Sequence, residues 1–98
     1  MEQFIRFPYG SGFIAVNTYG CYDVYANGDK GLVLDSLVGQ GGMKTTLQYS
    51  GTPTEDDAND LMALIARSSG NPFAQPVFNT ADGEGLNVNY AVRVTFPE

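Results

Sequence analysis

The chain has 98 residues, of which 43% are hydrophobic and 16% charged, and its formal net charge is −6 at pH 7. This composition supports one domain, residues 1–98, with a core of its own, and excludes a charge-rich disordered chain. The absence of histidine and the single cysteine, Cys21, exclude an internal disulfide and a zinc site built from several Cys or His ligands. The acidic balance opposes nucleic acid as a partner, because Lys and Arg supply most of the affinity for phosphate backbones.

The first half of the sequence predicts short strands that are separated by glycine-containing turns. Apolar and polar residues alternate within several runs, which is the pattern of a half-buried strand. Asn27-Gly28 supplies the positive φ angles that a tight hairpin turn requires, and no helical pattern separates the runs. The pattern therefore predicts a meander of antiparallel hairpins. The strands are predicted at residues 3–7, 13–17, 21–26, 32–38 and 43–49.

The strand at 32–38 is apolar on both faces, although a strand with one face in water should alternate. One helix covers only one patch of a sheet, so we expect a second copy of the chain to cover the other face; packing within the chain is the alternative. Tyr25 belongs to the same prediction, because alternation places it on the face opposite Val24. The expected interface of this homo-oligomer consists of Tyr25, Leu32, Val33, Leu34, Leu37 and Val38.

One amphipathic helix is predicted from Thr54 to Ser69. Thr54 suits the N-cap position, and the three acids that follow it are favourable at the positive end of the helix dipole. Gly70 and Pro72 end the helix, because glycine suits the position after the C-cap and proline cannot continue the turn. Apolar residues at helical spacing define the buried face: Ala58, Leu61, Met62 and Ile65, with Leu64 widening it.

The remainder of the chain predicts two further strands. A short edge strand is expected at residues 76–79, where Pro76 suits the first position. The last strand is predicted at residues 86–96, and its six apolar residues on one face indicate a central strand of the core. The whole order predicts a mainly β fold of the α+β type. We expect a small, strongly bent antiparallel sheet or barrel of five to six strands, with the helix before the last strand.

No group of residues carries a recognised catalytic or ligand-binding motif. Residues 39–45 resemble a phosphate loop, but one residue separates the last glycine from Lys44, and a strand pattern follows. The acids at 55–57 and Asp60 are explained by the helix dipole, with a divalent cation as the less favoured alternative. Residues 79–84 lack the ligand spacing of a calcium loop. We therefore expect no enzyme activity, no cofactor, no nucleotide and no metal.

The element order over Phe4–Phe96 is similar to that of the SH3-like small barrels. It is similar, more loosely, to the Sm and Sm-like RNA-binding proteins, which assemble into rings through strand edges. No Sm signature motif is matched residue by residue, so no binding residue is carried over. The opening segment Met1–Pro8 and the later strand-then-helix pattern also look like short proteins of marine bacteriophages and marine metagenomes.

Two functions from different classes agree with the sequence. The first is a non-enzymatic structural or accessory protein that acts through self-association, with a viral origin implied by the phage resemblance. The alternative is a small binding module for a peptide, a ligand or single-stranded nucleic acid, which would use exposed tyrosines and the glycine-rich loop at residues 39–42. No signal peptide and no membrane-spanning run are visible, so we expect a soluble cytoplasmic chain without membrane contact. For a viral protein this means the host cytoplasm or the virion.

Overall fold

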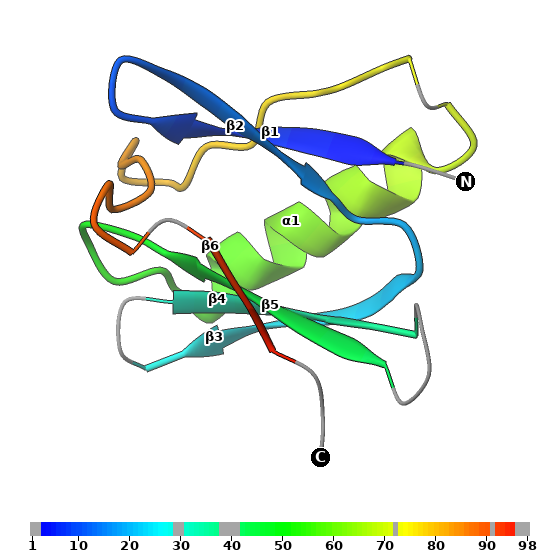
Figure 1. The fold of residues 1–98 in the computed structure, drawn as a ribbon, viewed down its shortest axis with the longest axis horizontal. Helices are drawn as coiled ribbons and strands as arrows, with labels where there is room; N and C mark the ends of the chain where they lie inside the picture. The colour runs from blue at the N-terminus through cyan, green and yellow to red at the C-terminus, as the bar shows by residue number, and fades with distance from the viewer. Residues whose placement is uncertain (1–2, 29–30, 38–41, 72, 91, 96–98) are drawn as a thin grey trace.

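The computed structural model describes residues 3–28, 31–37, 42–71, 73–90 and 92–95 of the chain. Within these residues it contains six strands and one helix, and the helix precedes the last strand (Figure 1). The predicted mainly β fold with a single helix before the last strand is therefore confirmed. The elements are β1 (Phe4–Tyr9), β2 (Gly12–Asn17), β3 (Cys21–Asn27), β4 (Gly31–Ser36), β5 (Met43–Gln48), α1 (Glu55–Ser68) and β6 (Val92–Thr95).

The strands form two antiparallel sheets. β1 pairs with β2 in a two-stranded sheet, and the other four strands lie in the order β3-β4-β5-β6. Leu86 joins the two sheets at one end, because it bridges both Tyr9 at the end of β1 and Tyr49 just after β5. Among the described residues the strands form two separate sheets and do not close into one barrel, so the predicted single bent sheet or barrel is replaced by a pair of sheets.

The segment after α1 runs along the side of β1 that faces away from β2. The backbone N–H of Arg6 donates a hydrogen bond to the Pro76 carbonyl at 2.8 Å, and the N–H of Phe78 donates to the Arg6 carbonyl at 2.9 Å. The strand predicted at residues 76–79 is thus reduced to one parallel bridge, between Arg6 and Val77. This segment satisfies the outer backbone groups at the middle of β1.

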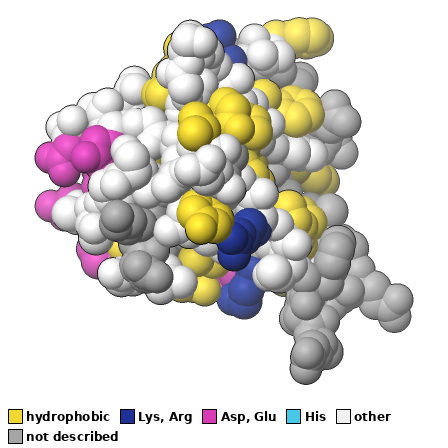
Figure 2. Space-filling model, turned by 60° about the vertical axis from the view of Figure 1, so that its left-hand side comes forward, with side chains coloured by type: hydrophobic (Ala, Val, Ile, Leu, Met, Phe, Trp, Pro, Cys, Tyr) yellow, Lys and Arg dark blue, Asp and Glu magenta, His cyan; other side chains and the backbone are white. Residues whose placement is uncertain are grey.

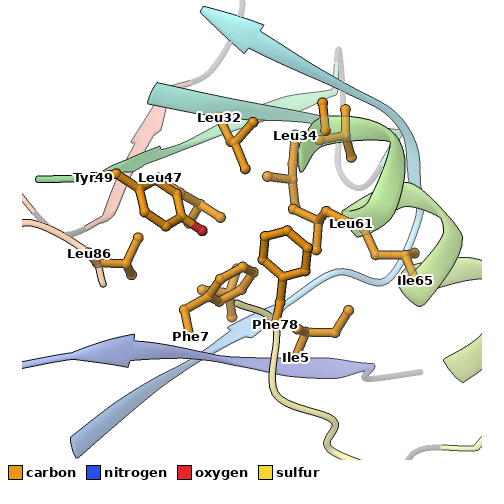
Figure 3. Packing of buried hydrophobic residues seen from close by; sticks show 13 residues of the cluster. Ile5, Phe7, Leu32, Leu34, Leu47, Tyr49, Leu61, Ile65, Phe78 and Leu86 are labelled. Carbon is orange, nitrogen blue, oxygen red and sulfur yellow. The ribbon is translucent and has the colours of Figure 1, made fainter. Parts of the chain in front are cut away.

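The core lies between the two sheets and α1 (Figure 3). The helix contributes Ala58, Leu61 and Ile65, as the helical spacing predicts. The rings of Phe7 and Phe78 meet edge to face, with their centroids 6.0 Å apart. The other buried apolar side chains of this cluster are Ile5, Val16, Val24, Leu32, Leu34, Leu47, Tyr49 and Leu86.

The helix α1 begins with Thr54 at the N-cap, as its sequence predicts, and the structure adds a capping box. Thr54 Oγ1 accepts a hydrogen bond from the Asp57 N–H at 3.3 Å, and Asp57 Oδ2 accepts one from the Thr54 N–H at 2.9 Å. Glu55 Oε1 accepts a hydrogen bond from the Ala26 N–H at 3.3 Å. Because Ala26 belongs to β3, this contact and the packing of α1 on β3 protect the outer edge of the four-stranded sheet.

The predicted last strand, residues 86–96, is wrong in length and position. Among the described residues the strand covers Val92–Thr95, and it lies at the edge of its sheet rather than at the centre. The reason is local, because Asn87 Oδ1 accepts a hydrogen bond from the Asn89 N–H at 2.9 Å and the Asn87 carbonyl accepts one from the Tyr90 N–H at 3.0 Å. These bonds make a turn where the alternation predicts a strand. Phe96, at the end of the prediction, lies outside the described residues.

Candidate interaction site at the open sheet edges

The structure places three of the predicted interface residues inside the single chain. Leu32 and Leu34 are 0% and 1% exposed and belong to the core between the sheets and α1. Val33 points to the opposite face of the sheet and is nevertheless only 4% exposed. The expectation that a second copy covers the other face of this segment is therefore corrected for these three side chains, because the chain itself covers them, which is the alternative that the sequence left open.

Val33 is covered by side chains from the neighbouring strands. Its cross-strand partners are Tyr25 on β3 and Thr46 on β5. Lys44 reaches over β4 from β5, because its Nζ lies 3.2 Å from the Tyr25 hydroxyl and 2.8 Å from Asp35 Oδ1. These two hydrogen bonds raise the pKa of Lys44 above its ordinary value, and the bond to Asp35 has the larger effect. Alternation along one strand does not reveal such a cover, because the covering residues come from other strands.

Two more of the predicted interface residues, Leu37 and Tyr25, lie in the described part of the chain. Leu37 is 74% exposed and lies beyond the end of β4, whereas Tyr25 is half-buried on the outer face of the sheet. Val38 and residues 39–41 lie outside the described residues. For Tyr25, Leu37 and Val38 the predicted interface stays a prediction, and the edges of the two sheets offer a second candidate site.

Two strand edges are open among the described residues. β2 pairs only with β1, and β6 pairs only with β5. The remaining edges are protected, because α1 covers β3 and the segment around Val77 covers β1. An unpaired edge presents free backbone N–H and C=O groups and is a ready template for pairing with another chain.

An apolar cleft of about 210 Å³ lies between these two open edges. Val16 and Ile14 line it from β2, and Val92 and Val94 line it from β6. No charged side chain lines the cleft. β6 lies at an edge of its sheet here, which the sequence pattern of residues 86–96 does not predict. The full lining consists of Ile14, Ala15, Val16, Asn17, Met43, Thr45, Val92 and Val94.

A second, larger cleft of about 460 Å³ lies between the β2–β3 connection and the C-terminal end of α1. Gln3 is buried there; its Nε2 donates to the Asn71 carbonyl at 3.5 Å, and its Oε1 accepts no hydrogen bond from a described residue. Burial raises the pKa of the Cys21 thiol to about 11, which keeps this sulfur protonated at neutral pH and lowers its reactivity as a nucleophile. The lining consists of Gln3, Thr18, Tyr19, Gly20, Cys21, Ile65, Ser69 and Gly70.

The acids at the start of α1 serve the fold in this structure. Asp57 accepts hydrogen bonds through both carboxylate oxygens, from Thr54 and from the Ala81 N–H at 2.9 Å. Within the described ranges, no group of three or more acidic, Cys or His side chains is placed to hold a metal ion.

The only described helix is too short and too polar to cross a bilayer. Comparisons with protein-family models, curated proteins and solved structures found no match to this chain.

Proposed function

We propose that this chain is a non-enzymatic structural or accessory protein that acts by self-association. The observation that carries the proposal is the pair of open strand edges, β2 and β6, on either side of an uncharged apolar cleft. Open edges of this kind are normally covered, charged or interrupted, because they otherwise recruit further strands. A second copy of the chain carries the same open strands and is always present beside the first, so it can serve as the partner.

The element order that resembles SH3-like and Sm-like barrels supports the same proposal. The Sm and Sm-like proteins assemble through strand edges, and a strand added at the open cleft here would extend the sheet toward closure. The resemblance to short phage proteins adds a viral origin to the proposal. The place of action is then the host cytoplasm or the virion.

Light scattering coupled to size exclusion tests the proposal directly. The chain has a mass of 10.5 kDa, so a dimer or a larger closed oligomer is distinguished from a monomer without any label. We expect a discrete oligomer whose population rises with protein concentration. A monomer over the whole range from micromolar to millimolar concentration would refute self-association as the function.

A small binding module is the second candidate, and the cleft of about 460 Å³ favours it. This cleft is wide enough for a small molecule, and its lining includes the largely buried Gln3 and the exposed Tyr19. Its lining carries no charged side chain, so an uncharged ligand with hydrogen-bond donors suits it. Ligand-observed NMR against a fragment library tests this candidate, with Gln3→Leu as the variant that should lose any hit.

A further inference from the structure

β2 is the less protected of the two open edges. It is six residues long, from Gly12 to Asn17, and contains no charged residue. The described part of β6 is four residues long and carries Arg93, whose guanidinium lies 5.0 Å from the Tyr90 ring. A charge on a short edge strand discourages pairing with another chain, and a long uncharged edge lacks this protection. β2 is therefore the edge on which a partner strand would pair.

The backbone groups that β2 offers to a partner follow from the bonds of β1. Arg6 pairs with Ala15, yet its own N–H and C=O bond to Pro76 and Phe78 on the far side of β1. Opposed residues of an antiparallel pair either exchange both hydrogen bonds or none, so the N–H and C=O of Ala15 must point to the open edge. The same alternation gives this orientation to Phe13 and Asn17.

We propose that two copies of the chain pair through β2, antiparallel, with Ala15 opposite Ala15 of the second copy. This assignment rests on the proposed self-association and names its surface. In an antiparallel sheet, directly opposed residues lie on the same face. A two-fold axis that ran between two neighbouring residues would oppose residues from different faces, so the axis must run through a residue. An axis at Ala15 pairs Phe13 with Asn17 of the second copy and uses every outward-facing residue of β2. An axis at Ile14 would leave Asn17 unpaired.

The side chains of β2 suit this symmetric arrangement. A side chain on the axis meets its own copy, and Ala15 is small and exposed, so two copies meet there without a clash. Ile14 and Val16, which line the apolar cleft, face each other across the joint and cover part of its apolar surface. The two-stranded sheet, which is marginal by itself, becomes one sheet of four strands, β1-β2-β2-β1.

The charge distribution favours a second copy at this edge over other approaches. The chain carries a net charge of −6, so two copies repel each other through most of their surfaces. Figure 2 shows most of the visible Asp and Glu side chains gathered on one side, away from Lys and Arg side chains that lie among hydrophobic ones. β2 has no acid, and its cross-strand neighbour at the proposed axis is the cation Arg6. Contact through β2 therefore keeps the acidic surfaces apart.

Two matched charge variants test the assignment. Ala15→Glu places a carboxylate opposite Arg6 within the chain, so the monomer tolerates the change. In the proposed dimer the same substitution brings two carboxylates face to face across the two-fold axis. Thr95→Glu makes the same change on β6, opposite Lys44. In sedimentation equilibrium we expect Ala15→Glu to raise the dimer dissociation constant at least tenfold and Thr95→Glu to change it less than threefold. The reverse result would overturn the assignment, and a monomeric wild-type chain would instead overturn the proposed function itself.

Cysteine cross-linking in a Cys21→Ser background tests the register without introducing charge. The Cα atoms of a hydrogen-bonded antiparallel pair lie about 5.5 Å apart, which is within the range of a disulfide. We expect Ala15→Cys to form a disulfide-linked dimer on mild oxidation, and Phe13→Cys to form one only when mixed with Asn17→Cys. A chain that dimerises while Phe13→Cys cross-links with itself and Ala15→Cys does not would overturn the register.

Discussion

Replacement of Asp57 by asparagine should destabilise the fold more than the loss of one surface charge would. Asp57 is only 4% exposed, and its two carboxylate oxygens accept hydrogen bonds from Thr54 and from the Ala81 N–H. Asparagine keeps the shape of the side chain but turns one acceptor oxygen into an NH2 donor. One of the two sets of donors, at the helix start or at Ala81, then loses its partner.

The magnitude follows from two contributions. A buried donor left without an acceptor costs about 1–3 kcal/mol. Loss of a negative charge at the start of a helix costs about 0.3–1 kcal/mol. We therefore expect Asp57→Asn to lower the free energy of unfolding by about 1–4 kcal/mol. With a urea dependence near 2 kcal/mol per molar, the unfolding midpoint should fall by about 0.5–2 M.

Urea unfolding followed by circular dichroism provides the measurement, and Asp56→Asn is the matched control. Asp56 lies in the same first turn of α1 and carries the same charge, but it is exposed and makes no hydrogen bond to a described residue. The control should lose no more than about 1 kcal/mol, which is the dipole contribution alone. Equal stabilities of the two variants would refute the buried network around Asp57.

The pH dependence gives the same reasoning an independent check. Burial by itself would raise the pKa of Asp57, but the hydrogen bonds from Thr54 and Ala81 outweigh it and lower the pKa below its ordinary value of 3.8. A lowered pKa in the folded state means that the contribution to stability is complete above pH 3.8 and is lost as the pH falls through the folded value. The stability difference between the wild type and Asp57→Asn should therefore shrink in acid.

Three further outcomes are expected. Tyr49→Phe should leave stability unchanged or raise it by up to about 2 kcal/mol, because the buried Tyr49 hydroxyl has no hydrogen-bond partner among the described residues; a lower thermal midpoint would contradict this. Val33→Asp should abolish folding, seen as loss of the far-ultraviolet circular dichroism signal, because Val33 lies inside the chain; a folded monomer would contradict its burial. Cys21 should react slowly with iodoacetamide at pH 7 and faster as the pH approaches 11, because burial raises the pKa of its thiol; rapid alkylation at neutral pH would be the contrary result.

The helix is predictable from the sequence because its determinants are local. Thr54 and Asp57 form the capping box within four residues, and the apolar spacing from Ala58 to Ile65 fixes the buried face. The strands up to residue 48 are predictable for the same reason, since alternation and glycine turns act over short distances. The last strand is not, because the Asn87 side chain and carbonyl hold a turn that alternation does not reveal.

The candidate site depends on which edges stay open, and this is decided by contacts between distant segments. Residues 13–17 alternate in the same way whether β2 is a central strand or an edge strand, so its pattern alone cannot distinguish the two. β1 is completed on its far side by Pro76 and Phe78, and β3 is covered by Glu55, all of which lie far away along the chain. β2 is the long strand that none of these segments reaches. Once β2 is known to be an edge strand, one feature of its sequence distinguishes it from β6. Residues Gly12 to Asn17 carry no charge, whereas β6 carries Arg93.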